Sequence, residues 1–212
     1  RKFAVDIDEL HLAVLGLGKL GGRGLDYDSD LDMILVYDDA LPSPVAGLTE
    51  TEFYARVAEL LVTTLSSMTR DGSLYRVDLR LRPYGSKGLT AMPASGFIEY
   101  LENTAAIWEM LAFVKLRAAG GDLNLGNPVE QNARKIIHRR ALEIDPGELA
   151  AETRRVRLAL QKQRTRPRRA SEVDIKYGEG GMLDVYFAMR YLQLRHNVPD
   201  DPKDRSTTAM LA

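Results

Sequence analysis

A glycine-rich loop between two apolar runs most constrains how this chain can fold. Residues 14–39 read VLGLGKLGGRGLDYDSDLDMILVYDD, and the second apolar run follows Asp30 and Asp32 directly. Residues 21–30 hold three glycines and three aspartates, a composition that disfavours a helix between the two runs. The segment therefore predicts two strands joined by a loop, with the second strand central in a sheet because it is apolar on both faces.

This arrangement argues against two common nucleotide-binding motifs. Residues 16–21 match G-x-G-x-x-G, and Asp38 follows at about the distance of a ribose-binding acid. That motif must open a helix of several turns before the next strand, and residues 21–30 are poor helix material. A Walker A loop is excluded as well, since no Gly-Lys-Ser/Thr follows the glycines.

Asp30 and Asp32 form a candidate metal site. Alternate residues of a strand point to the same side, so both carboxylates would share one face. Like charges in one site are costly unless a cation lies between them, and Mg²⁺ typically binds one or two carboxylates plus substrate phosphates. The upstream glycines leave backbone N–H groups available to phosphates. The alternative is structural, since Asp also favours turns and strand ends.

A second charged segment supplies a third carboxylate. Residues 73–82 (SLYRVDLRLR) alternate and predict a strand, although Leu74 is out of phase with the later apolar residues. Its opposite face carries Asp78 among Arg76, Arg80 and Arg82, which suits an anionic ligand and a metal. With Asp30 and Asp32, Asp78 would allow two metal ions, the arrangement that clamps both oxygens of an in-line phosphoryl displacement.

The rest of the chain is predicted to be mainly helical. Apolar spacing and capping signals predict helices over residues 49–68, 94–102, 105–119, 128–142, 146–162 and 182–195, with a loop over 120–127. The fold class is therefore α+β, a mixed sheet with helices followed by a helical region. We expect a catalytic domain over 1–120 and a helical region over 121–212 that packs on it. Within that region, 198–212 is expected to be a linker to a missing domain.

Composition narrows the function classes. Lys and Arg number 29 and Asp and Glu 30 in 212 residues, so the net charge of -1 does not indicate a nucleic-acid binder. No apolar run approaches the roughly 20 residues of a membrane span. The absence of cysteine excludes disulfides and thiolate metal sites and fits a cytoplasmic location. The basic residues from Arg154 to Arg169 predict a solvated helix face, with an acidic partner or nucleotide as the alternative.

Three ordered motifs, GKLGG…SDLD, YRVDLRLRP and DIK…GGMLD, resemble the glutamine synthetase adenylyltransferase family of the polymerase-β-like nucleotidyltransferase superfamily. The resemblance implies that Asp30, Asp32 and Asp78 are the catalytic and metal-binding residues. It implies a further set that holds the triphosphate or the nucleotide, namely Gly21, Gly22, Ser29, Lys19, Arg80, Arg82 and Lys176. Two positions depart from the family pattern, since Gly24 and Tyr186 stand where the family usually has Glu.

The resemblance also implies a reaction. Two Mg²⁺ ions and ATP would serve AMP transfer to a tyrosine of glutamine synthetase, with release of pyrophosphate. Asp78 is the best candidate to accept the hydroxyl proton or to orient the nucleophile. A PII signalling protein is an expected partner through the full-length enzyme, and neither nucleic acid nor membrane is expected. Two alternatives stay open. The domain is the homologous half that removes AMP by phosphorolysis, or it is a catalytically weak nucleotide-sensing module.

Overall fold

The structure is a computed structural model that describes residues 5–6, 9–70, 72–164 and 174–211. It divides into two compact units, one of residues 1–105 and 115–136 and one of residues 106–114 and 137–212. This division differs from the predicted boundary at residue 120, since residues 121–136 belong to the first unit. The domain assignment itself stays a prediction.

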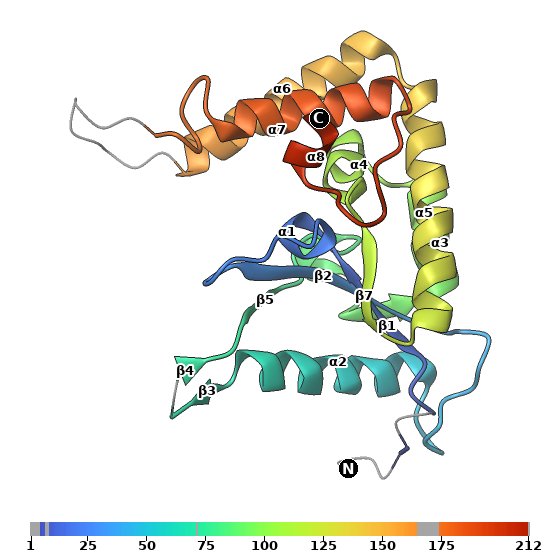
Figure 1. The fold of residues 1–212 in the computed structure, drawn as a ribbon. Coiled ribbons are helices and arrows are strands. Elements are labelled where there is room, and N and C mark those ends of the chain that lie inside the picture. The colour runs from blue at the N-terminus through green and yellow to red at the C-terminus, as the bar shows by residue number, and fades with distance from the viewer. Residues whose placement is uncertain (1–4, 7–8, 71, 165–173, 212) are drawn as a thin grey trace. The chain divides into compact units, whose positions relative to one another are not determined.

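An open mixed sheet forms the centre of the first unit (Figure 1). Its order is β5-β2-β1-β7, and β6 pairs with the other end of β2. β1 is antiparallel to both β2 and β7, whereas β5 and β6 run parallel to β2. The strands are β1 (Leu12–Gly16), β2 (Asp30–Tyr37), β5 (Arg76–Asp78), β6 (Ala91–Pro93) and β7 (Arg117–Gly121). The predicted α+β class with a mixed sheet is confirmed.

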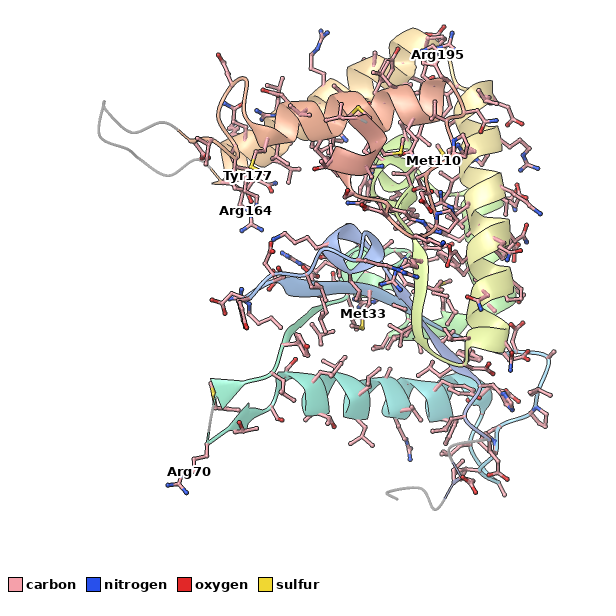
Figure 2. All side chains as sticks on the ribbon, viewed as in Figure 1. Met33, Arg70, Met110, Arg164, Tyr177 and Arg195 are labelled. Atoms are coloured by element: carbon pink, nitrogen blue, oxygen red, sulfur yellow. The ribbon has the colours of Figure 1, made fainter. Side chains whose placement is uncertain are left out.

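The helix α2 (Glu50–Ser66) lies along one face of this sheet (Figure 1). Phe53 and Tyr54 are fully buried in the core with β2, and Met33 of β2 points toward α2 (Figure 2). The predicted capping box at Thr49 is confirmed, because its hydroxyl accepts a hydrogen bond from the Glu52 N–H and the Glu52 carboxylate accepts one from the Thr49 N–H. The packing face and the cap together fix where this helix begins.

Between β1 and β2 the chain forms a single helical turn, α1 (Gly18–Gly21), followed by turns up to Ser29. The absence of a longer helix here agrees with the composition of residues 21–30. The prediction of a direct strand–loop–strand connection is confirmed, and so is the argument against a dinucleotide-binding crossover.

The predicted strand over residues 73–82 is wrong in extent. Only Arg76–Asp78 pairs with β2, while β4 (Gly72–Ser73) forms a hairpin with β3 (Met68–Thr69). After Asp78 the chain turns, because the Asp78 carboxylate accepts a hydrogen bond from the Arg80 N–H at 2.8 Å. A short 3-10 helix, η2 (Gly85–Lys87), follows. Local side-chain hydrogen bonds thus end a strand that alternation alone would extend.

Two helix predictions fail around residue 120. The predicted helix over 105–119 is only α4 (Ile107–Phe113), because residues 117–121 pair with β1 as β7. The predicted loop over 120–127 is also wrong, since α5 (Leu123–Glu143) begins inside it. The Asp122 carboxylate accepts hydrogen bonds from the N–H groups of Asn124 and Leu125 and so starts this helix. The helix α3 (Ala94–Asn103) agrees with its prediction.

The second unit contains α4, α6 (Pro146–Arg164), α7 (Met182–Arg195) and α8 (Thr207–Leu211). The prediction for α7 is confirmed at both ends. Residues 198–211, expected to be a linker, carry α8 and a buried pair in which Arg205 lies 3.5 Å from Asp200. No helix among the described residues has the length and hydropathy needed to cross a bilayer.

Arg157 of α6 is an exception to the predicted solvated basic face, since Arg154, Arg155, Lys162 and Arg164 are exposed. Its side chain is 5% exposed and donates to the Asp184 carboxylate at 2.6 Å. It also donates to the carbonyls of Tyr177 and Gly178 at 3.1 and 2.8 Å. The loop before α7 is therefore held on α6 by one guanidinium. Residues 165–169 of the basic run lie outside the described residues.

Arg157→Ala should lower the free energy of unfolding by about 2 kcal/mol, because four charge-assisted hydrogen bonds disappear, three to the segment before α7 and the start of α7 and one to the Gln161 side chain. Hydrogen exchange should quicken in residues 174–184. The matched control is Arg155→Ala, since Arg155 pairs with Glu152 at the exposed surface and should change stability by less than about 1 kcal/mol. Denaturant unfolding of the 212-residue chain measures both, and equal effects would contradict the assignment.

Candidate active site

The pairing of β2 with β5 brings the three predicted carboxylates together. In this parallel register Asp30 lies opposite Arg76 and Asp32 lies opposite Asp78. The residues between them, Leu31 and Val77, turn to the opposite side and pack in the core. Two strands separated by more than forty residues of sequence thus place their acidic side chains on one face of the sheet.

Asp32 is the electrostatic centre of this carboxylate cluster, which we define as Asp30, Asp32 and Asp78. Burial is the main cause that raises the pKa of Asp32 to about 6, and the neighbouring charges of Asp78 and Asp30 add to it. The opposing effect of Arg80 is smaller. A carboxylate in this position is costly to ionise, and a cation placed beside it would relieve that cost.

Two arginines balance the other members of the carboxylate cluster. Arg76 donates from Nε to Asp30 at 2.8 Å and from Nη2 to the Asp28 carbonyl at 2.6 Å. Arg80 donates from Nε to both carboxylate oxygens of Asp78, at 3.0 and 2.9 Å. Arg80 therefore lies beside Asp78 and holds the orientation of its carboxylate, and its role toward a nucleotide stays a prediction.

The carboxylate cluster fits a hard divalent cation by its donor chemistry, since it offers carboxylate oxygens that repel one another. Among the described residues, however, no group of three or more His, Asp and Glu side chains is arranged to hold a metal ion. Arg76 and Arg80 engage Asp30 and Asp78, and they supply the positive charge that a cation would otherwise bring. The residues present are therefore compatible with Mg²⁺, and metal binding stays a prediction.

The glycine turn α1 closes over Asp32. The Leu17 N–H donates to the Asp32 carbonyl at 2.8 Å, and Gly18 has a φ of 52°. A Cβ at Gly18 would lie 2.5 Å from the Asp32 carboxylate oxygen Oδ2. Only glycine fits here, for both its backbone conformation and its space. Gly18 is a site residue that the sequence analysis missed, although it stands in the G-x-G-x-x-G pattern.

The predicted phosphate-binding glycines meet β7 and the residues before it. A Cβ at Gly21 would lie 2.3 Å from the Lys115 carbonyl oxygen, and one at Gly22 would lie 2.9 Å from the Lys115 ammonium. Arg117 donates to the carbonyls of Leu20 and Gly21 at 2.7 and 3.1 Å. The close approach of Lys115 and Arg117 explains why two glycines stand at positions 21 and 22. The sequence around Lys115 and Arg117 does not predict this contact. A phosphate role for Gly21 and Gly22 stays a prediction.

Lys19 and Ser29 lie in contact, and their predicted binding of a nucleotide stays a prediction. The Lys19 ammonium donates to Asp26 at 2.6 Å and to the Ser29 hydroxyl oxygen at 3.3 Å, and that oxygen accepts from the Asp26 N–H at 3.1 Å. The hydrogen bond from Lys19 lowers the pKa of Asp26. The hydrogen bonds among Lys19, Asp26 and Ser29 stabilise the loop that leads into Asp30.

Two predicted nucleotide-binding residues have their described contacts outside the carboxylate cluster. Arg82 donates to the carbonyls of Leu79, Ser86 and Gly88 at 2.8 to 3.3 Å, so it shapes its own loop. Lys176 belongs to the second unit, with its ammonium 5.2 Å from the centre of the Tyr177 ring. Their roles toward a nucleotide stay predictions.

The residues of the third motif also lie in the second unit. The Asp184 carboxylate accepts a hydrogen bond from the Gly180 N–H at 2.6 Å. Tyr186 lies with its ring centre 5.3 Å from the Arg190 guanidinium. Within this unit both side chains serve local packing.

An open mixed sheet that sets acidic residues of paired strands beside a glycine turn defines a domain of the nucleotidyltransferase-like class. A comparison with family models matches residues 4–132 to the glutamate-ammonia ligase adenylyltransferase family. The chain belongs to this family, as its motifs predicted.

Named relatives agree with the family match. The bifunctional glutamine synthetase adenylyltransferase/adenylyl-removing enzyme of Chromobacterium violaceum is 40% identical over 184 residues, which cover 87% of this chain and 19% of the relative. The enzymes of the same name from Bordetella bronchiseptica and Pseudomonas aeruginosa are each 36% identical, over 189 and 191 residues, which cover 89% of this chain and 19% of each relative. The chain spans about a fifth of the length of these relatives.

Gly18→Ala should lower the free energy of unfolding by about 2 kcal/mol or more, since an L side chain there is strained and meets the Asp32 carboxylate. Gly24→Ala is the control, because a Cβ at Gly24 meets no atom within 4 Å, and it should change stability by less than about 0.5 kcal/mol. Denaturant titration of both variants tests this, and a Gly18→Ala variant as stable as the parent chain would refute the close approach.

Asp32→Asn should stabilise the metal-free chain in a pH-dependent way. The pKa of Asp32 is raised on folding from 3.8 to about 6, so ionising it costs stability as the pH rises through this interval, and the cost is complete above it. Near pH 8 the variant should gain about 2 kcal/mol after allowance for solvent screening, and near pH 4 almost nothing. Chemical denaturation in a chelating buffer at both pH values measures the gain.

Asp30→Asn provides the contrast, because Asp30 pairs with Arg76 at the surface and its removal should give no gain. If Asp32→Asn brought no gain near pH 8, or if both variants gained equally, the electrostatic account of Asp32 would be wrong.

Proposed function

We propose that this chain is a nucleotidyl-transfer domain that attaches AMP from ATP to a tyrosine of glutamine synthetase. The observation that supports it best is the carboxylate cluster, which β2 and β5 place beside the glycine turn. The names of the relatives support the choice of substrate protein. The same names supply ATP-dependent adenylyl transfer as the reaction class.

We further propose that the carboxylate cluster binds two Mg²⁺ ions. Asp32 lies between two like charges, an arrangement that a divalent cation stabilises. Bound there, the metal would supply charge stabilisation for the phosphoryl oxygens of ATP. Arg76 and Arg80 also carry positive charge at this face.

The protein contributes to the remaining steps mainly by positioning the reacting groups. The tyrosine hydroxyl oxygen attacks the α-phosphorus, the bond from that phosphorus to the bridging oxygen breaks, and pyrophosphate leaves with the electron pair. Asp78 accepts the hydroxyl proton, and Arg80 keeps its carboxylate in a fixed orientation. Lys19 and Ser29, which are joined by a hydrogen bond, are proposed to contact the triphosphate. Such a site works mainly by alignment and charge stabilisation.

The second candidate is the adenylyl-removing reaction, in which phosphate releases AMP from modified glutamine synthetase. It is supported by the bifunctional names of the relatives together with the length of this chain, which matches only a fifth of each. A PII signalling protein is proposed to act through the full-length enzyme rather than on this domain alone.

Purified glutamine synthetase incubated with radiolabelled ATP and Mg²⁺ should acquire label when the 212-residue chain is added. Asp30→Asn combined with Asp32→Asn should reduce the rate by at least about a hundredfold without loss of the folded state, which circular dichroism checks. Gly24→Ala, whose Cβ would meet no atom within 4 Å, should keep the rate.

The reverse assay assigns the direction. Modified glutamine synthetase incubated with phosphate should lose no label if the domain attaches AMP, and release of labelled ADP would identify the removing half. If neither reaction occurs while ATP still binds, the domain is a nucleotide-sensing module and the proposal of an active enzyme fails.

A further inference from the structure

A pocket of about 640 Å³ adjoins the carboxylate cluster in the first unit. Two segments that are distant in sequence line it, residues 25–29 before β2 and residues 74–76 at the start of β5. Ser29 and Arg76 are the immediate neighbours of Asp30, the first in sequence and the second in strand register. A molecule seated in this pocket therefore lies next to the proposed transfer site.

Apolar side chains stand exposed around this pocket. Tyr27 is fully exposed, Leu74 is 63% exposed, and Tyr75 and Leu25 are 45% and 40% exposed. Single exposed apolar residues are ordinary, but four of them around one pocket mark a binding surface. Exposed tyrosines and leucines that a partner can desolvate are typical of protein interfaces.

Away from Ser29, the proposed triphosphate contact at the edge next to Asp30, the charges of the pocket disfavour a phosphate. Asp26 and Asp28 belong to its wall, and Lys19 serves as the counter-charge of Asp26. Arg76, the cation of the wall, donates to Asp30 and to the Asp28 carbonyl. Among the described residues no ion pair joins the Asp28 side chain, so the wall keeps its negative charge. The occupant that complements it is apolar or aromatic and carries positive charge nearby.

We propose that this pocket binds the acceptor protein, through an apolar or aromatic side chain that is flanked by basic residues in the segment carrying the tyrosine. The proposal rests on the proposed function, because it concerns the polypeptide that receives AMP. The competing occupant of similar shape is the adenine ring, which is also flat and uncharged. Its attached phosphates would have to pass the acidic wall, and the two occupants predict different kinetics.

Tyr27→Ser and Leu74→Ser test the apolar part of the pocket. Both side chains are exposed, so neither change should affect folding. Each should raise the KM for glutamine synthetase by about tenfold, a typical loss for one interface anchor, and leave the KM for ATP and kcat unchanged. Leu60→Ser is the matched control, since Leu60 is 42% exposed on α2 and lies outside the pocket lining.

Asp28→Lys tests the charge. For a basic acceptor segment the reversal should raise the KM for glutamine synthetase by more than the neutral Asp28→Asn, and the difference should shrink at high salt. For a pocket that holds nucleotide, the same reversal should lower the KM for ATP. A changed KM for ATP with an unchanged KM for glutamine synthetase overturns the proposal in favour of adenine.

The activity and the binding of the parent chain distinguish failure of this proposal from failure of the proposed function. If the parent neither adds nor removes AMP, the proposed function fails, and binding of the chain to immobilised glutamine synthetase becomes the measurement. Weaker binding of Tyr27→Ser and Leu74→Ser, with Leu60→Ser unchanged, would support the docking pocket even then. Equal binding by all three variants and the parent would overturn it.

Discussion

The parallel pairing of β2 with β5 is the interaction on which the rest of this structure depends. It sets Asp32 beside Asp78 and Asp30 beside Arg76 across more than forty residues of chain. On one side the pairing buries Leu31 and Val77 with α2, and on the other it creates the repulsion that raises the pKa of Asp32 to about 6. The apolar side supports an acidic side that would not assemble on its own.

Much of this arrangement could be predicted from the sequence because it depends on local chemistry. The capping box at Thr49, the bounds of α7 and the second strand after Asp30 each rest on residues a few positions apart. The predicted strand over residues 73–82 fails for the same reason, since alternation cannot reveal that Asp78 binds the Arg80 N–H and turns the chain. The strand β7 was missed because residues 117–121 become a strand only against β1.

Prediction of the site from the sequence has the same limit, because contacts between distant residues carry no local signal. The spacing of the aspartates in the sequence predicts their role. The role of Gly18 cannot be predicted in this way, because it depends on the Asp32 carboxylate, which lies within 2.5 Å of the position of a Cβ at Gly18. Lys115 and Arg117 reach the glycine turn from a strand that the sequence did not predict. Arg157 looked like one member of a solvated basic run, and its partners are a carboxylate and two carbonyls from the loop before α7. Residues that act on distant backbone carry no periodic signal.

Arginine has two different uses around the carboxylate cluster, and the difference bears on how the site works. Arg76 pairs with Asp30 at the surface, where solvent weakens the pair and a stronger cation can replace it. Arg80 is exposed as well, but it pairs with the largely buried side chain of Asp78. Arg82 and Arg117 donate to backbone carbonyls and shape the loops beside the site. Under the proposed function, charge that changes during the reaction is thus held by side-chain ion pairs, and the backbone around it is held by bonds that need not change. The exposed pocket at residues 25–29 and 74–76 is lined in part by Arg76. An acceptor that docks there would therefore lie beside the side-chain ion pairs of the carboxylate cluster.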